Sequence, residues 1–164
     1  MLILGIDPGT TSAGYALLEN QDHKLKIITA DLFKVNSSRG EERLMEIHNG
    51  VRKLIKDWRP QILALERLFF ASNQKTALDV AQARGVILLT AALAGLKVYE
   101  YTPLEIKKIV SGDGKADKNQ IKKILGLTLP EVKNLKAADD VFDAIATALA
   151  CHYKDSRFYA KDLI

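Results

Sequence analysis

Residues 2–11 read LILGIDPGTT, and this stretch decides the fold because it puts a charge at the end of a buried strand. Leu2–Ile6 has the apolar character of a strand inside a sheet, and Pro8-Gly9 then breaks the chain with a turn. Asp7 lies between the two. A buried carboxylate is costly unless it is paired or binds a metal ion, so Asp7 is either a solvated turn residue or the first part of a site.

The segments that follow predict a mixed sheet. Two more strands, expected at 13–18 and 24–35, are joined by short polar turns, so the first three strands form an antiparallel meander. Helical and strand patterns then alternate. We expect helices over 44–58, 75–94, 104–110, 118–125 and 137–152, and strands over 62–65 and 97–101. This order predicts an α/β fold with a five-stranded mixed sheet, helices on both faces and a single domain over 1–164.

Composition excludes several classes of protein and site. The apolar share of 48% and the charged share of 27% are typical of a globular protein, and we expect neither a membrane-spanning helix nor a signal peptide. The single cysteine, Cys151, excludes an internal disulfide and a thiolate zinc site, and it fits a reducing cytoplasm. The histidines are scattered. A metal site would therefore use oxygen ligands, which favours Mg²⁺ or Mn²⁺.

Positive charge is concentrated in one segment. Residues 101–136 contain eight lysines and four acids, an excess equal to the net charge of +4 of the whole chain. Such a segment is typical of a surface that contacts a phosphate backbone, although solvated helix faces give the same pattern.

Four carboxylates are predicted to meet at one end of the sheet. Glu66 lies on the face of its strand that also carries Ile62, and Asp7 has the matching place after the first strand. If these two strands are parallel neighbours, both acids lie at their carboxyl ends, where α/β sheets place ligands. Asp140 and Asp143 are three residues apart and so share one face of an otherwise apolar helix.

Each acid alone has an ordinary explanation, in a turn, at a strand end or at a helix cap. Together they form a set able to hold two divalent ions about 4 Å apart, which activate water and stabilise the leaving oxygen in phosphodiester hydrolysis. Asp139 is rotated by about 100° from Asp140 on the helix, so we interpret it as an N-cap or as a residue that supports the metal ligands.

Three motifs resemble the RuvC family of Holliday-junction resolvases. They are GIDPGTTSAGYALLE (5–19), LALERLFFASNQKTALDVAQARGV (63–86) and DDVFDAIATALACH (139–152), and they follow in the family's order over nearly the whole chain. The resemblance implies a ribonuclease-H-like fold and a metal-dependent endodeoxyribonuclease that resolves Holliday junctions in DNA recombination and repair. It also implies paired symmetric nicks, made by metal-activated water attack on the phosphodiester and leaving 5′-phosphate ends.

The same resemblance suggests roles for individual residues. Phe69 matches an aromatic residue that stacks near the crossover bases, and Phe70 adds apolar surface, unless the loop is packed into the core. Lys107 and Lys118 match basic residues that contact DNA phosphates. The family's catalytic metal ligands, which bind Mg²⁺ with Mn²⁺ as a possible substitute, match Asp7, Glu66, Asp140 and Asp143.

Partners are also implied by the resemblance. The family acts as a homodimer on four-way junction DNA, works with a branch-migration motor complex of RuvA and RuvB proteins, and is cytoplasmic. Ala77, Ala81 and Gly85 form a stripe of small residues on the long predicted helix, which would suit either a dimer contact or packing on the sheet.

Three other functions compete with this one. An actin-like ATPase or kinase would use DPGTT as a phosphate loop, but it needs a second related domain for which 164 residues leave no room. A non-catalytic junction-binding module is disfavoured by the complete set of carboxylates. Another ribonuclease-H-like nuclease, acting on RNA–DNA hybrids or other branched nucleic acids, fits the carboxylates equally well and the lysines less well.

Overall fold

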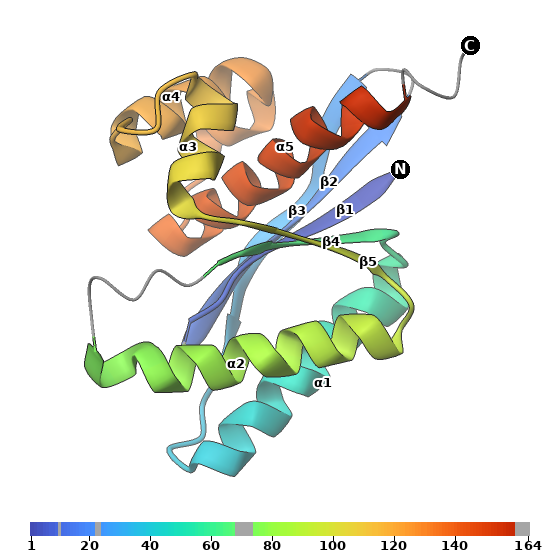
Figure 1. The fold of residues 1–164 in the computed structure, drawn as a ribbon, viewed down its shortest axis with the longest axis vertical. Helices are drawn as coiled ribbons and strands as arrows, with labels where there is room; N and C mark the ends of the chain where they lie inside the picture. The colour runs from blue at the N-terminus through green and yellow to red at the C-terminus, as the bar shows by residue number, and fades with distance from the viewer. Residues whose placement is uncertain (10, 22–23, 68–73, 160–164) are drawn as a thin grey trace.

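A five-stranded mixed sheet lies at the centre of the computed structural model, which describes residues 1–9, 11–21, 24–67 and 74–159 (Figure 1). Its strand order is β3-β2-β1-β4-β5. The strands are β1 (Leu2–Asp7), β2 (Ser12–Gln21), β3 (Lys24–Lys34), β4 (Ile62–Glu66) and β5 (Lys97–Tyr101). β1, β2 and β3 pair antiparallel, whereas β4 pairs parallel with both β1 and β5. The predicted meander and the predicted mixed sheet are confirmed.

Helices cover both faces of this sheet, as predicted. One face carries α1 (Gly40–Trp58) and α2 (Gln74–Leu93), and the other carries α3 (Pro103–Ser111), α4 (Lys118–Thr128) and α5 (Asp139–Tyr159) (Figure 1). Each face has its own apolar core, because alternate residues of β1, β2 and β4 point to opposite sides. No helix in the described part of the chain is long and apolar enough to cross a membrane.

Several helix boundaries differ from the predicted ones: α1 begins at Gly40 and not at residue 44, α4 ends at Thr128 and not at 125, and α5 ends at Tyr159 and not at 152. The last helix begins at Asp139 instead of at residue 137, because alanine favours a helix wherever it lies and so cannot mark a start. Between α4 and α5 the chain forms a short 3₁₀ helix, η1 (Pro130–Asn134), which the sequence patterns did not predict. Asp117 caps the start of α4, since its side chain accepts a hydrogen bond from the Gln120 backbone N–H at 2.9 Å.

Two glycines let α5 lie directly on the sheet. A Cβ atom on Gly5 of β1 would come within 2.3 Å of the Ala144 carbonyl oxygen, and one on Gly14 of β2 within 2.0 Å of the Asp140 carbonyl oxygen. No larger residue fits at either position without moving the helix. The start of α5, with its aspartates, is therefore held against the carboxyl end of β1.

Candidate active site

Asp7 and Glu66 lie side by side at the carboxyl ends of two paired strands. Ile6 of β1 is in register with Leu65 of β4, and each is followed directly by one of the two acids. Ile3 points to the same face of the sheet as Asp7, and Ala64 to the same face as Glu66, because alternate residues of a strand share a face. Ile3 and Ala64 belong to the core beneath α5. Asp7 and Glu66 therefore point to the α5 face, as the strand pattern predicted.

Helix α5 brings Asp140 and Asp143 to the same end of the sheet. Asp7 is in register with Gly14, and Gly14 is the residue that the Asp140 backbone touches. The negative charges of Asp143 and Asp140 both raise the pKa of Asp7, so the two carboxylates lie close to it. The structure thus brings together the four carboxylates that the sequence singled out.

Burial and mutual repulsion disfavour the negative charges of Asp7, Glu66 and Asp143. Burial first, and then the charges of Glu66, Asp143 and Asp140 in that order, raise the pKa of Asp7 to about 8. Burial likewise raises the pKa of Glu66 to about 7, with Asp143 as the next cause. Burial is also the main reason that the pKa of Asp143 is raised. A site of this kind gains stability from a bound cation.

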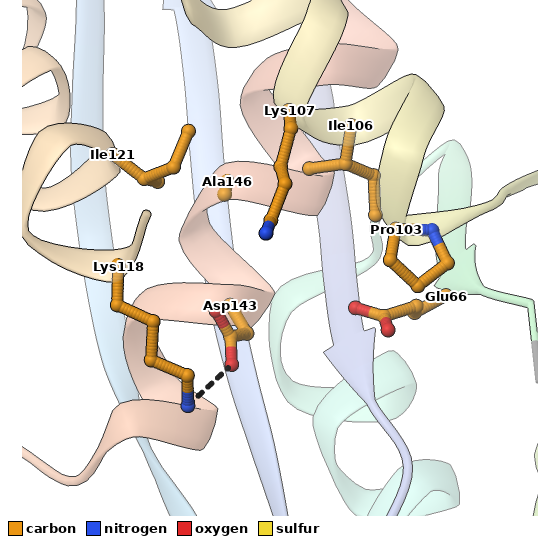
Figure 2. A pocket seen from close by; sticks show the side chains of 8 residues that line it. All are labelled: Glu66, Pro103, Ile106, Lys107, Lys118, Ile121, Asp143 and Ala146. Atoms are coloured by element: carbon orange, nitrogen blue, oxygen red, sulfur yellow. Dashed lines mark ion pairs between the residues drawn. The ribbon is translucent and has the colours of Figure 1, made fainter. Parts of the chain in front are cut away.

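Two lysines face the carboxylates across a pocket of about 240 Å³ (Figure 2). Lys107 comes from α3 and Lys118 from the first turn of α4, and both line the pocket with Glu66 and Asp143. The Lys118 Nζ lies 3.8 Å from the Asp143 Oδ2. Apolar walls complete the pocket: Pro103, Ile106, Ile121 and Ala146.

Asp139 pairs with two lysines of α4. Its Oδ2 accepts a hydrogen bond from the Lys118 Nζ at 3.0 Å, and its Oδ1 accepts one from the Lys122 Nζ at 2.8 Å. Hydrogen bonds from Lys122 and then Lys118 lower the pKa of Asp139 to about 2. Asp139 is the first residue of α5 and not its cap, so the capping interpretation is wrong. Sequence reasoning missed Lys122, although its spacing of four from Lys118 places both on one helix face.

Oxygen ligands and unfavourable negative charge make this site suitable for a divalent cation. All four acids are hard oxygen donors, the type that Mg²⁺ and Mn²⁺ prefer. Within the described residues, no three Asp, Glu, His or Cys side chains are gathered tightly enough to hold an ion as they stand. Binding therefore requires the carboxylates to turn towards a common centre. The donor chemistry fits the ion, and the repulsion among the acids is what the ion would relieve.

Other predicted residues are not part of this cluster. Phe69 and Phe70 lie outside the described residues. On α2, Gly85 is exposed, and a Cβ atom added to it would meet no atom within 4 Å. The stripe of small residues therefore does not pack on the sheet along its whole length. The side of α2 that faces away from the sheet instead carries Leu78, Leu89 and Leu93, which are 69%, 60% and 76% exposed.

Comparisons with known proteins agree on one family. A family model described as crossover junction endodeoxyribonuclease RuvC matches residues 3–152. The chain is 41% identical over 162 residues to the crossover junction endodeoxyribonuclease RuvC of Halothermothrix orenii, covering 98% of this chain and 97% of that protein. It is 46% identical over 155 residues to the protein of that name from Moorella thermoacetica, covering 93% and 90%.

Solved structures give the same result. Thermus thermophilus RuvC matches with a TM-score of 0.84 and 28% identity, and the match covers 96% of both chains. A second structure, of that protein in complex with a Holliday junction substrate, matches with a TM-score of 0.83 and 26% identity over 96% of both chains.

Proposed function

Because this chain belongs to the RuvC family of crossover junction endodeoxyribonucleases and resolves Holliday junctions, we propose that its active site is the cluster of Asp7, Glu66, Asp140 and Asp143. The observation that carries this assignment is the convergence of four acids from β1, β4 and α5 in one partly buried place. Buried carboxylates that raise each other's pKa are rare outside functional sites.

The family consists of metal-dependent nucleases, and we propose Mg²⁺ as the ion, with Mn²⁺ able to replace it. A divalent ion at this site supplies Lewis-acid stabilisation of the phosphodiester and lowers the pKa of the attacking water. The chain's own residues do the rest. The sheet fixes the backbone of Asp7 and Glu66, and α5 fixes that of Asp140 and Asp143, so only the carboxylate side chains would have to turn towards the ion.

Lysines beside the carboxylates suit the DNA strand that is cut. Lys107 and Lys118 line the same pocket as Glu66 and Asp143, where a scissile phosphate would lie. A separate groove of about 430 Å³ lies along α4 and η1, and its lysines are Lys122, Lys123 and Lys133. None of the described residues that line this groove is acidic. The proposal is that a junction arm leaves the active site along these lysines, whose contacts depend on the phosphates and not on the sequence.

The test of the active site is an Asp7→Asn variant assayed on labelled four-way junctions. This change keeps the shape of the side chain but removes a ligand charge, so cleavage with Mg²⁺ should fall by at least about 100-fold. Junction binding in EDTA at neutral pH should be unchanged, because the lysines remain and burial raises the pKa of Asp7 to about 8, which keeps its carboxyl largely uncharged without metal.

A matched Asp57→Asn variant is the control, because Asp57 pairs with Lys53 on the exposed side of α1. It should cleave like the parent protein. Normal cleavage by Asp7→Asn would refute the assignment. Duplex DNA and RNA–DNA hybrid, tested beside the junction, distinguish a junction resolvase from another nuclease of the same fold.

The proposed assembly is a homodimer formed through α2. Leu78, Leu89 and Leu93 form an apolar row on the side of α2 away from the sheet, where an isolated domain gains nothing from them. Two copies that cut opposite strands would make the symmetric pair of nicks, with 5′-phosphate ends, that a resolvase needs. A branch-migration complex of RuvA and RuvB proteins, and a cytoplasmic location beside the chromosome, complete the proposal.

A further inference from the structure

Lys118 lies between two carboxylates with different roles. Its Nζ is 3.0 Å from the Asp139 Oδ2 and 3.8 Å from the Asp143 Oδ2. Asp143 is one of the proposed metal ligands, whereas Asp139 lies one helical turn earlier on the same side of α5 and is exposed. A lysine ammonium this close to a metal ligand competes with a divalent ion for the same oxygen.

Asp139 is itself held from a second point. Its Oδ1 accepts a hydrogen bond from the Lys122 Nζ at 2.8 Å, and that ammonium lies 4.4 Å from the centre of the Phe142 ring. The ring is buried, so it gives Lys122 a fixed place. Lys122 thus orients the carboxylate of Asp139 so that the other oxygen, Oδ2, accepts the hydrogen bond from Lys118.

We propose that Asp139 is a positioning residue that holds the Lys118 ammonium beside Asp143 instead of on it, and so leaves Asp143 free to bind the metal ion. This inference rests on the proposed active site. Lys118 then stays within reach of the DNA phosphate at the same pocket, and the entering ion does not have to break a full ion pair. Without Asp139, the nearest partner left for Lys118 is Asp143.

The experiment is a double-mutant cycle measured as Mn²⁺ affinity in the absence of DNA, by titration calorimetry. Asp139→Asn should weaken Mn²⁺ binding by about two- to fivefold, the value of a partly exposed ion pair that must now be displaced. Lys118→Met should strengthen it by a smaller factor, because Asp139 already holds the Lys118 ammonium beside Asp143 and the change removes only its through-space repulsion of the ion. In the double variant, Mn²⁺ should bind as in Lys118→Met alone.

The double variant separates positioning from a plain charge effect. A negative charge at Asp139 that attracted the ion through space would give the same loss in both backgrounds, and that result would overturn the inference. So would unchanged affinity in Asp139→Asn. Asp139→Glu, which keeps the charge, should restore most of the parent affinity.

The dependence of the cleavage rate on Mn²⁺ concentration gives a second readout. A purely structural role of Asp139 would not change this dependence. Asp139→Asn should cut slowly at limiting Mn²⁺ and at the parent rate at saturating Mn²⁺, with no rise in KM for the junction. A rate that saturating metal fails to restore would count against the proposal. Asp7→Asn, titrated in parallel, tests the metal site itself: if it binds Mn²⁺ like the parent, the active-site assignment fails whatever Asp139 does.

Discussion

Burial of Asp7 suits its proposed role as a metal ligand but lowers the stability of the metal-free protein. The strand that precedes it is fully buried, and the same burial that gives Asp7 a fixed position raises its pKa to about 8. In the metal-free protein at neutral pH the native state therefore holds a proton on Asp7 that the unfolded chain releases. If these residues form the proposed metal site, the burial that favours a bound cation there lowers the stability of the empty protein.

The stability of the metal-free protein should therefore fall as pH rises. Asp7 and Glu66 have native pKa values of about 8 and about 7, above the ordinary values of 3.8 and 4.5, so between these limits the native state binds more protons than the unfolded chain. For each extra proton that the native state binds, the free energy of unfolding falls by about 1.4 kcal/mol with each unit by which the pH rises. Asp139, with a pKa of about 2, is ionised throughout this range.

Urea unfolding in EDTA at pH 5.5, 7.0 and 8.5 measures this effect. Asp7→Asn should have a shallower pH dependence than the parent and should be the more stable of the two at pH 8.5, although it does not cleave. Mg²⁺ added at pH 8.5 should stabilise the parent and leave Asp7→Asn nearly unchanged. Equal slopes for the two proteins would show that Asp7 ionises normally in the empty site.

At the scale of elements, the contact between α5 and β2 sets the position of two of the four carboxylates. Gly14 has no room for a methyl group because the Asp140 carbonyl oxygen would lie 2.0 Å from it. Gly14→Ala should push the start of α5 away from the sheet, at a cost of about 1–3 kcal/mol in stability. A shift of about 1 Å at the catalytic groups should lower the cleavage rate by about 100-fold.

The matched control for Gly14→Ala is Gly40→Ala, because a Cβ on Gly40 meets no atom within 4 Å. That variant should fold and cleave like the parent. Thermal unfolding and single-turnover cleavage of both variants measure the two effects. A Gly14→Ala protein with normal activity would mean that α5 adapts to the methyl group without moving Asp140.

Strand periodicity predicted the strand half of this site well. Alternation in residues 62–66 placed Glu66 on the correct face, and the apolar run before Asp7 placed that residue at the end of a strand. Both are local properties of the chain. The parallel pairing of β1 with β4 depends on the topology of the whole sheet. The sequence patterns did not predict this pairing, and from the sequence it could only be assumed.

The contacts between α4 and α5 could not be predicted in the same way. The Asp139 carboxylate meets lysines that are 17 and 21 residues earlier in the chain, across a turn and a 3₁₀ helix that no pattern indicated. Long side chains such as lysine take their partners from tertiary packing, and that packing depends on where α4 lies against α5. The sequence therefore left Asp139 with two interpretations, and only the geometry excluded the cap.

In the whole molecule, the sheet separates the catalytic side from the side proposed for assembly. The proposed active-site residues and the lysine groove lie with α3, α4 and α5, whereas α2 and its exposed leucines lie across the sheet (Figure 1). A dimer formed through α2 would leave both catalytic faces open. Two such faces could then reach two strands of one junction at the same time.

Loss of the apolar row on α2 should therefore separate the two cuts. In a Leu89→Gln/Leu93→Gln variant the interface loses two side chains that are largely exposed in the monomer, and burying each should be worth about 1.5–3 kcal/mol. We expect a monomer by analytical ultracentrifugation. On a supercoiled plasmid with an extruded cruciform, the monomer should yield nicked circles, because the first cut removes the supercoiling that holds the junction. The parent should yield linear plasmid from two cuts.

Leu127→Gln is the matched control, since Leu127 is 71% exposed but lies on α4, on the catalytic side of the sheet. It should remain a dimer and linearise the plasmid. If the α2 variant also remains a dimer, the assembly surface lies elsewhere. If it becomes monomeric and still linearises the plasmid, then a single catalytic face makes both cuts, and the separation of the two faces by the sheet has no part in resolution.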